Sequence, residues 1–293
     1  MQYINDDHVK IERSIQIGRY TIVLLAIVLG ACLPDPLEVT GIPEVKPQIV
    51  VSTQIIPDQS LVVLLTKSFG ALDASEDSDP QELLDQIAVN DALVTIAGPQ
   101  RTDTLVSLGS GLYGGIVIPF ENGGEYHLHV VSESLGEVSA TTTVKPRIVF
   151  DTIDAELYFN GYDSLVRISY KFTDPAAKNW YMLNVQQIER SELIEDVLNP
   201  PASMRLLDDA DFTSNVYGES FNVVQRDFNT GDTIAVFFSN ISEDYYNFVK
   251  LRLDNRYSFT EYLSEPVNYP TNIEGGKGFF NLYVPDVRTF IVE

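Results

Sequence analysis

The chain has 293 residues and a formal net charge of −23 at pH 7, from 42 acidic and 19 basic side chains. This charge disfavours a nucleic-acid-binding protein, because binding to nucleic acid depends on basic side chains that displace counterions from phosphates. It disfavours direct adsorption to an anionic membrane surface for the same reason. The only cysteine is Cys32, so the chain cannot form an internal disulfide and its fold must depend on its apolar core.

The N-terminal segment has the features of an export signal. Residues 20–31 form an apolar run that follows basic residues such as Arg19. A basic flank, a short apolar stretch and small residues before the cut are typical of a secretory signal. The run is shorter than the roughly 20 apolar residues that a membrane-spanning helix needs. Because Leu29-Gly30-Ala31 directly precedes Cys32, we expect a lipoprotein signal that is cut before an acylated Cys32; an ordinary signal peptide or a short membrane anchor is the alternative.

The rest of the chain exceeds the usual size of one domain, about 100–150 residues, and predicts two. After a signal peptide at 1–31, residues 32–44 contain several prolines and predict a tether. A proline at 146 and a change in composition after it place the domain boundary there. We therefore expect one domain at 45–145 and a second at 146–293.

The first domain reads as a series of short apolar or β-branched runs between glycine-rich turns. Strands are predicted at 48–52, 61–65, 92–97, 102–108, 115–119, 126–132 and 138–144. An acidic segment at 73–79 predicts a solvated loop, followed by a short helix at 80–87. Seven short strands at this spacing predict an immunoglobulin-like β-sandwich.

The second domain continues the β pattern and adds a helix. Strands are predicted at 148–153, 165–172, 180–187, 216–225, 233–238, 279–284 and 288–292, and a further helical turn at 261–263. The helix is predicted at 242–255, with Ser242 as its N-cap and acidic residues in its first turn. The predicted fold class is therefore mainly β: an immunoglobulin-like sandwich followed by a β-rich α+β domain with one or two short helices.

Residue types that usually carry catalysis are scarce. His127 and His129 alternate along one strand and lie on the same face, where they could chelate a metal if a carboxylate completed the set. Because no further ligand is evident, a solvent-exposed strand face is favoured, and no cofactor is expected.

Other motifs favour structure over chemistry. No Gly-x-Ser-x-Gly motif is present, and the many acidic residues make chance carboxylate pairs uninformative. The acidic segments 73–79 and 208–211 could hold calcium but lack the spacing and glycine of a known calcium loop. The glycine-rich segment 275–278 resembles a fragment of a phosphate loop, although a tight turn is favoured.

Aromatic residues are concentrated in the second domain and suggest a binding surface. Trp180, Tyr181 and Tyr262 are the candidate ligand-binding residues. The alternative is that most of these aromatic side chains form the core.

Several local patterns occur in a characteristic order after the lipoprotein cysteine. They are Phe172-Thr173-Asp174-Pro175, Asn179-Trp180-Tyr181, Asp208-Asp209-Ala210-Asp211-Phe212, Ser242-Glu243-Asp244-Tyr245-Tyr246 and Asn272-Ile273-Glu274-Gly275-Gly276-Lys277-Gly278-Phe279-Phe280. In order and spacing the chain resembles the domain of unknown function 4249 family of bacterial outer-membrane lipoproteins, of the Bacteroidota type. The resemblance covers nearly the whole chain after the signal and contains no catalytic signature.

The resemblance implies an outer-membrane lipoprotein that faces outward and whose genes commonly adjoin those of TonB-dependent receptors. We therefore expect a non-enzymatic accessory or ligand-binding protein, held in outer-membrane lipid through acylated Cys32, with a TonB-dependent nutrient receptor as a partner. Two alternatives remain: a surface glycan hydrolase that uses paired carboxylates, and a structural spacer or adhesin.

Overall fold

The computed structural model describes residues 46–55, 60–68, 85–114, 118–188, 203–223, 228–255 and 268–293. These residues belong to one compact unit, residues 45–293, and form two β-sandwiches and one long helix. The prediction of a mainly β fold that begins with an immunoglobulin-like sandwich is confirmed. Within the part of the chain described, no helix has the length and apolar character needed to cross a membrane.

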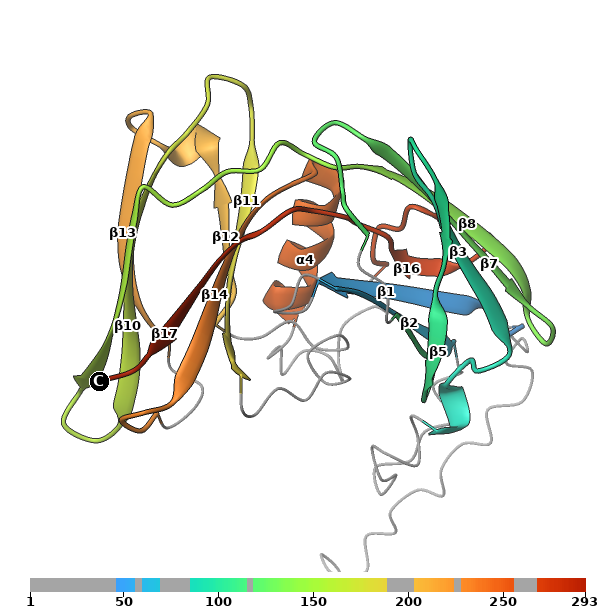
Figure 1. The fold of residues 1–293 in the computed structure, drawn as a ribbon, viewed down its shortest axis with the longest axis horizontal. Helices are drawn as coiled ribbons and strands as arrows, with labels where there is room; N and C mark the ends of the chain where they lie inside the picture. The colour runs from blue at the N-terminus through green and yellow to red at the C-terminus, as the bar shows by residue number, and fades with distance from the viewer. Residues whose placement is uncertain are drawn as a thin grey trace, which may run out of the picture. The chain divides into compact units, whose positions relative to one another are not determined.

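The first sandwich consists of two five-stranded sheets (Figure 1). One sheet has the strand order β16-β1-β2-β6-β5 and the other the order β15-β8-β7-β3-β4. The strands from the first half of the chain are β1 (Ile49–Ile55), β2 (Leu61–Lys67), β3 (Ala92–Ala97), β4 (Thr102–Thr104), β5 (Val106–Gly109), β6 (Leu112–Gly114), β7 (Glu125–Ser132) and β8 (Gly136–Thr143).

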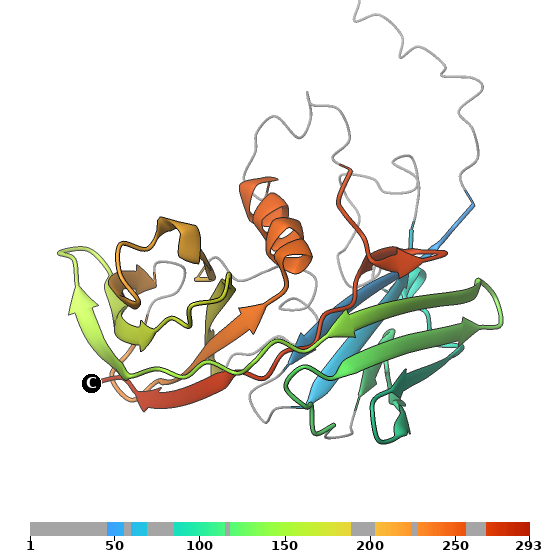
Figure 2. The ribbon, with the colours of Figure 1, turned by 90° about the horizontal axis from the view of Figure 1, so that it is seen from above.

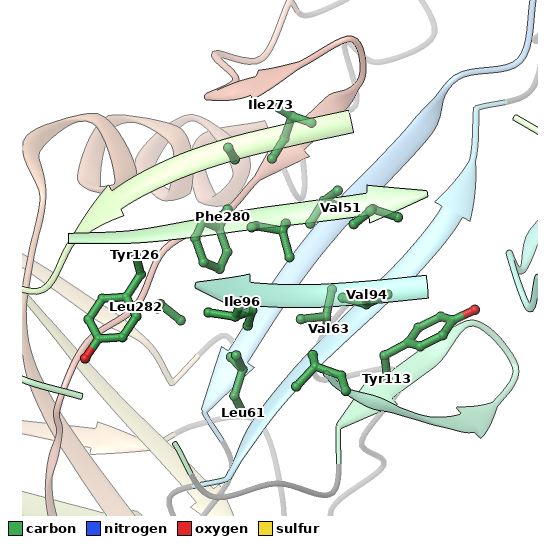
Figure 3. Close-up of a cluster of buried hydrophobic side chains, with 14 of the residues drawn as sticks. Val51, Leu61, Val63, Val94, Ile96, Tyr113, Tyr126, Ile273, Phe280 and Leu282 are labelled. Carbon is green, nitrogen blue, oxygen red and sulfur yellow. The ribbon is translucent and has the colours of Figure 1, made fainter. Parts of the chain in front are cut away.

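The core of the first sandwich lies between these two sheets (Figure 3). Alternate residues of β7 are buried, among them Tyr126, Leu128 and Val130, while the residues between them are exposed. This period of two is what a strand with one solvated face requires. The hydroxyl of Tyr126 accepts a hydrogen bond from the Glu121 N–H at 2.9 Å, which satisfies its polar end at the margin of the core.

Two strands predicted in the first sandwich differ from the structure. The single strand expected at 102–108 is two strands, β4 and β5, which lie in different sheets. The change of sheet occurs at Leu105, whose side chain is buried. The strand expected at 115–119 lies partly outside the described residues. The acidic loop expected at 73–79 lies wholly outside them, as do residues 80–84 of the helix expected at 80–87.

The second sandwich packs the sheet β13-β10-β9 against the sheet β12-β11-β14-β17. Its strands are β9 (Thr152–Phe159), β10 (Ser164–Thr173), β11 (Trp180–Gln187), β12 (Arg205–Asp208), β13 (Val216–Val223), β14 (Thr233–Ile241) and β17 (Asp286–Ile291). Its core is rich in aromatic rings; the Phe172 ring lies 4.9 Å from that of Tyr181 and 4.6 Å from that of Phe238, centroid to centroid.

The beginning of the second sandwich also departs from prediction. Residues 148–151, expected to be strand, form no ladder, and β9 runs from Thr152 instead. Ile148 and Phe150 are nevertheless buried, and the Phe150 N–H donates to Asp286 Oδ2 at 3.0 Å. The segment is thus fixed by side-chain burial, by the Asp286 carboxylate and by a hydrogen bond of 2.9 Å from the Asp151 N–H to Lys171 O, without a strand ladder.

Close to its C-terminus the chain returns to the first sandwich (Figure 2). The C-terminal hairpin, β15 (Ile273–Glu274) and β16 (Lys277–Phe279), adds one strand to each sheet of that sandwich. β15 pairs antiparallel with β8, and β16 pairs parallel with β1. The hairpin therefore covers one edge of both sheets, and an exposed edge is where unwanted strand pairing occurs.

Glycines let the C-terminal hairpin approach β1 closely. A Cβ at Gly278 would lie 1.9 Å from Val51 O, and the backbone there has φ +92°, in the left-handed region. A Cβ at Gly276 would lie 2.6 Å from Ile49 O. Both positions need glycine because a β-carbon would collide with backbone that the parallel pairing brings near.

Residues 280–285 connect the C-terminal hairpin to β17 of the second sandwich. The prediction of a strand at 279–284 is wrong beyond Phe279, because this segment has no ladder partner. Phe280 and Leu282 are buried in the first core, which accounts for the strand-like apolar pattern. The Thr53 hydroxyl donates to Asn281 O at 3.2 Å and holds the crossing segment against β1.

The predicted helix is present as α4 (Glu243–Asn255). Ser242 caps it, since its hydroxyl accepts a hydrogen bond from the Tyr245 N–H at 3.2 Å. Phe248 and Val249 pack on Phe279 of the C-terminal hairpin and on Leu206 of β12. The helix thus contacts a strand of each sandwich.

Candidate functional site

Three of the sequence motifs meet at one end of the second sandwich. Lys178 forms ion pairs with Asp208 and with Asp209, the second at 2.6 Å between Nζ and Oδ1. The Asn179 N–H donates to Asp209 Oδ2 at 2.5 Å, and the Tyr181 hydroxyl donates to Asp174. The acidic residues of this corner are thus engaged by a cation, a backbone amide and a phenol.

The charges of this corner shift the pKa values of its members. The pKa of Lys178 is raised to about 12, first because its ammonium donates hydrogen bonds to Asp208 and then to Asp209. Burial raises the pKa of Asp208, but the Lys178 ammonium and the Ala210 N–H outweigh burial and leave that pKa below its usual value. Burial, with the neighbouring Asp174, raises the pKa of Tyr181.

The candidate ligand-binding aromatics lie in different environments. Trp180 is half-buried at the start of β11, with Lys178 Nζ 5.1 Å from its ring centroid. Tyr181, the next residue, points to the opposite face and is completely buried in the second core. Tyr262 lies outside the described residues. Of the two described, only Trp180 is partly exposed, and it packs against the first core.

The two candidate metal-binding histidines both lie on the solvated face of β7. His127 Nε2 is 3.2 Å from Glu125 Oε1, and its Nδ1 is 2.9 Å from the hydroxyl of Thr141. His129 Nε2 is 3.5 Å from Glu137 Oε2. Each histidine therefore has its own carboxylate neighbour. Among the described residues, no three side chains of His, Cys, Asp or Glu are grouped to hold a metal.

The strand β11 has two faces of different character. Tyr181, Leu183 and Val185 point into the second core. The even-numbered residues Trp180, Met182, Asn184 and Gln186 must point the other way, because neighbouring side chains of a strand alternate. We call this side of the β12-β11-β14-β17 sheet the outer face of the second sandwich; Met182 and Ile241 on it belong to the first core, and Trp180 packs against that core.

Three polar side chains on the outer face each have a buried oxygen without a hydrogen bond. Asn184 is 8% exposed, Gln186 is 5% exposed and Ser239 of β14 is 0% exposed. Asn184 Oδ1, Gln186 Oε1 and Ser239 Oγ have no hydrogen-bond partner. We call these three residues the polar patch. Because nearly all buried polar groups in proteins are hydrogen-bonded, three unpaired groups on one sheet face require an explanation.

Strand register brings the polar patch together around one aromatic ring. Asn184 is directly opposite Phe237 of β14, and Gln186 is opposite Ala235. Ser239 is two residues from Phe237 on the same strand and shares its face. Phe237 is itself buried. The polar patch thus borders one apolar side chain, and all four residues are buried.

The comparisons with known proteins identify the family. The family described as a domain of unknown function (DUF4249) matches residues 35–289. The chain belongs to this family. No curated protein is significantly similar to it in sequence.

Solved structures also match the chain, among them two from chicken. A segment of two fibronectin type-III domains from chicken tenascin is 11% identical, with 84% of this chain and 97% of that chain covered and a TM-score of 0.22. The FN1–FN3 domains of chicken CNTN1 are 12% identical, with 66% of this chain and 60% of that chain covered and a TM-score of 0.22.

The motifs that suggested the family have structural tasks in the part of the chain described. Asp174 and Asp209 accept hydrogen bonds at the corner of the second sandwich. Ser242 caps α4, and Gly276 and Gly278 allow the C-terminal hairpin to pack on β1. The glycine-rich segment is thus a turn between two strands, as the sequence favoured.

The polar patch lies outside those motifs, and the sequence analysis missed it. The sequence does contain a pattern at these positions, because Asn184 and Gln186 alternate with Leu183 and Val185 along a predicted strand. That pattern ordinarily indicates a solvated face. Only the structure shows that this face is buried.

Proposed function

We propose that this protein is a non-enzymatic lipoprotein that binds a ligand at the outer membrane. Export would end with a cut before Cys32 and acylation of that residue, leaving the two sandwiches outside the cytoplasm on the tether at 32–44. Each buried methylene of an acyl chain contributes about 0.8 kcal/mol, so several chains would anchor the protein durably. Cys32 lies outside the described residues, and the sequence Leu29-Gly30-Ala31-Cys32 carries this part of the proposal.

Family membership and the lipoprotein signal before Cys32 are the observations that favour this proposal. A catalytic role receives no comparable support, because the carboxylates of the motif corner already bind Lys178, Asn179 and Tyr181.

We further propose that the protein faces outward and serves as an accessory to a TonB-dependent nutrient receptor. Family membership supports this role through the outer-membrane setting that the resemblance implies. A bound nutrient would then pass from the ligand site to the receptor. Cross-linking in cells, followed by identification of the captured membrane proteins, tests the partnership; capture of no receptor would contradict it.

The anchor is tested by labelling cells with palmitate and separating their membranes. The unaltered protein should carry label and sediment with the outer membrane. The Cys32→Ser variant should carry none, and it should be released or retained as an uncut precursor. Label-free wild-type protein would overturn the anchoring proposal.

A further inference from the structure

We propose that the edge strand β13 and the groove beside it bind an extended peptide segment that carries an acidic side chain. The segment would add a strand to the β13-β10-β9 sheet, as other chains do at exposed sheet edges. The inference rests on the ligand-binding part of the proposed function and gives it a site and a chemical class. We call the side of this sheet that points away from the second core the groove face.

β13 is an edge strand that lacks the usual protection of an edge. It pairs with β10 over eight residues, Val216–Val223, and no strand in the described part of the chain pairs with its other side. It contains no proline or lysine, and its one charged residue is Glu219. The Glu219 carboxylate accepts hydrogen bonds from the hydroxyls of Tyr170 and Tyr217, at 3.1 and 3.3 Å, on the side of the second core. Because edges are normally blunted by charge, proline, bulges or short length, β13 is open to another strand.

A groove of about 640 Å³ lies on the groove face next to this edge. Residues of all three strands line it, and those of β13 are Val216, Gly218, Glu219 and Ser220. Short side chains keep it open, since the hydroxyl oxygens of Ser169 and Ser220 lie 2.8 Å apart. Val216 is 50% exposed, and Gly218 and Ser220 are exposed as well. The groove therefore has an entry along the edge and space for the alternate side chains of a bound strand.

Gly218 lies in the middle of β13, and its φ is not in the left-handed region that would call for a glycine. A Cβ at this position would lie 2.8 Å from Lys171 Cγ and 3.1 Å from Tyr170 O. The aliphatic part of Lys171 therefore lies over Gly218, its partner in the strand register. A glycine inside a strand weakens the strand and often marks a place where a ligand or another backbone approaches closely. This glycine thus admits the Lys171 side chain to the edge and leaves room for a second backbone.

The charges of the groove face differ between its two edges. Lys171 reaches over β13 and forms no ion pair with any described residue. Arg167 spans the face: its Nε donates to Asn222 Oδ1 of β13 at 3.3 Å and its Nη1 to Glu156 Oε1 of β9 at 3.4 Å. The carboxylates of the face, Asp154 and Glu156, both belong to β9. A strand added beyond β13 would lie three strand spacings, about 14 Å, from β9, so its own carboxylate would meet Lys171 instead.

Two other classes of ligand match this edge less well. A basic peptide would place its cation beside Lys171. A sugar is commonly bound by stacking on an exposed aromatic ring, whereas the ring of Tyr158 on this face is covered by Arg167, whose guanidinium carbon lies 3.8 Å from the ring centroid. The net charge of −23 repels an acidic ligand chiefly at low salt, because charges farther apart than about 8 Å are screened at physiological ionic strength.

The test selects peptides against the full chain from a display library of random octapeptides. The best binder is synthesised with blocked ends, beside an amide analogue in which Gln or Asn replaces each acidic residue. Fluorescence anisotropy gives the Kd of both peptides for the wild type and for Lys171→Gln, Gly218→Val and Lys46→Gln. Lys46 is an exposed lysine outside the sheet, so its variant is the matched control. Hydrogen exchange of the β13 amides, with and without peptide, locates the binding.

The selected peptides should contain an acidic residue. Lys171→Gln should weaken the acidic peptide about fivefold and leave the amide analogue unchanged. Gly218→Val should abolish the binding of both, because its branched side chain occupies the edge, whereas Lys46→Gln should bind as the wild type does. The amides of residues 216–223 should exchange more slowly with peptide bound. Lys171→Gln leaves the backbone unaltered and decides the matter if Gly218→Val folds poorly.

Several outcomes would overturn the inference. Unchanged binding in Lys171→Gln and Gly218→Val, with no protection of β13, would place the peptide elsewhere and leave the proposed ligand-binding function standing. Binders without an acidic residue would reject the proposed class. Protection of β13 by self-association without peptide would make a second copy of the chain the occupant. A library that yields no binder would reject a peptide ligand, while cross-linking to a TonB-dependent receptor would still support the accessory role.

Discussion

The C-terminal hairpin and the outer face of β11 both bury polar groups, but they differ in how completely those groups are hydrogen-bonded. In the hairpin, glycines allow β16 to pair with β1, and Thr53 binds the segment that follows. On the outer face, Asn184, Gln186 and Ser239 are buried, and each has a side-chain oxygen without a hydrogen-bond partner. Beside the hairpin one buried atom, Asn281 Nδ2, is unpaired, whereas three are unpaired on the outer face, and unpaired buried groups lower stability.

The largest expected effect is that of Gly278→Ala in the hairpin. The new methyl group would meet Val51 O at 1.9 Å and would also require φ +92° of an alanine. We expect the free energy of unfolding to fall by about 3–5 kcal/mol, as measured by urea denaturation.

Gly109→Ala is the matched control for this change. Gly109 has φ +93°, but no atom lies within 4 Å of the point that a Cβ would occupy there. Backbone strain alone should cost about 1–2 kcal/mol. Equal losses for both variants would show that close packing of the hairpin contributes nothing.

Asp286→Asn should have the next largest effect. This buried carboxylate accepts from Arg147 at 2.9 Å, from Arg288 at 3.1 Å and from the Phe150 N–H at 3.0 Å. Hydrogen bonds to a charged group are worth about 1.5–3 kcal/mol, and both arginines are partly exposed and keep some hydration. We expect a loss of about 2 kcal/mol in a denaturant titration.

A surface pair provides the comparison for Asp286. Arg101 and Asp103 form an ion pair at 2.8 Å in which the arginine is half-exposed. Asp103→Asn should cost less than about 1 kcal/mol, because exposed pairs contribute little. A loss as large as that of Asp286→Asn would contradict the importance of burial.

Ser242→Ala should remove the cap of α4 and cost about 1 kcal/mol. Ser242→Asp should retain most of the stability, since its carboxylate can accept the same hydrogen bond and favours the helix N-terminus. Circular dichroism during thermal unfolding measures both variants. Equal losses in the two would argue that the cap is unimportant.

Lys178→Met should have the smallest effect, a fall of about 2 °C or less in unfolding temperature, because this ion pair lies largely at the surface. The effect should depend on pH. Folding lowers the pKa of Asp208 from its usual 3.8, so the contribution of the carboxylate is complete above about pH 4 and is lost as the pH falls further.

At high pH, the stability difference between wild type and Lys178→Met depends on the titration of Lys178. Folding raises its pKa from 10.5 to about 12, so its contribution is complete below pH 10.5 and is lost as the pH rises towards 12. The difference between wild type and Lys178→Met should therefore be constant from about pH 5 to 9 and shrink outside that range. A difference that changes within the range would contradict the assignment.

Much of the fold could be predicted from local patterns. The run from Trp180 to Gln187 and the capped helix after Ser242 have the expected bounds, because each is set by neighbouring residues. The parallel pairing of β1 with β16 could not be predicted, since it joins residues more than 200 positions apart. Residues 280–284 were predicted as a strand because they are apolar, although apolarity reports burial and not strand pairing.

The candidate site was only partly accessible to the same reasoning. Trp180 is on the outer face and packs against the first core, whereas Tyr181 is in the second core, because consecutive side chains of a strand point in opposite directions. The polar patch depends on what covers Asn184 and Ser239 in three dimensions, and no local pattern contains that information.

A disulfide between β1 and β16 tests most directly whether the C-terminal hairpin joins the first sandwich. Val50 and Lys277 are partners in the parallel register, and neighbouring strands lie about 4.8 Å apart, within the range that a disulfide spans. In a chain with Cys32→Ser, the pair Val50→Cys/Lys277→Cys has the only two thiols. We predict that mild oxidation closes this bond nearly completely, whereas Val50→Cys/Lys171→Cys stays reduced. Persistent thiols at 50 and 277 in the folded protein would contradict the account.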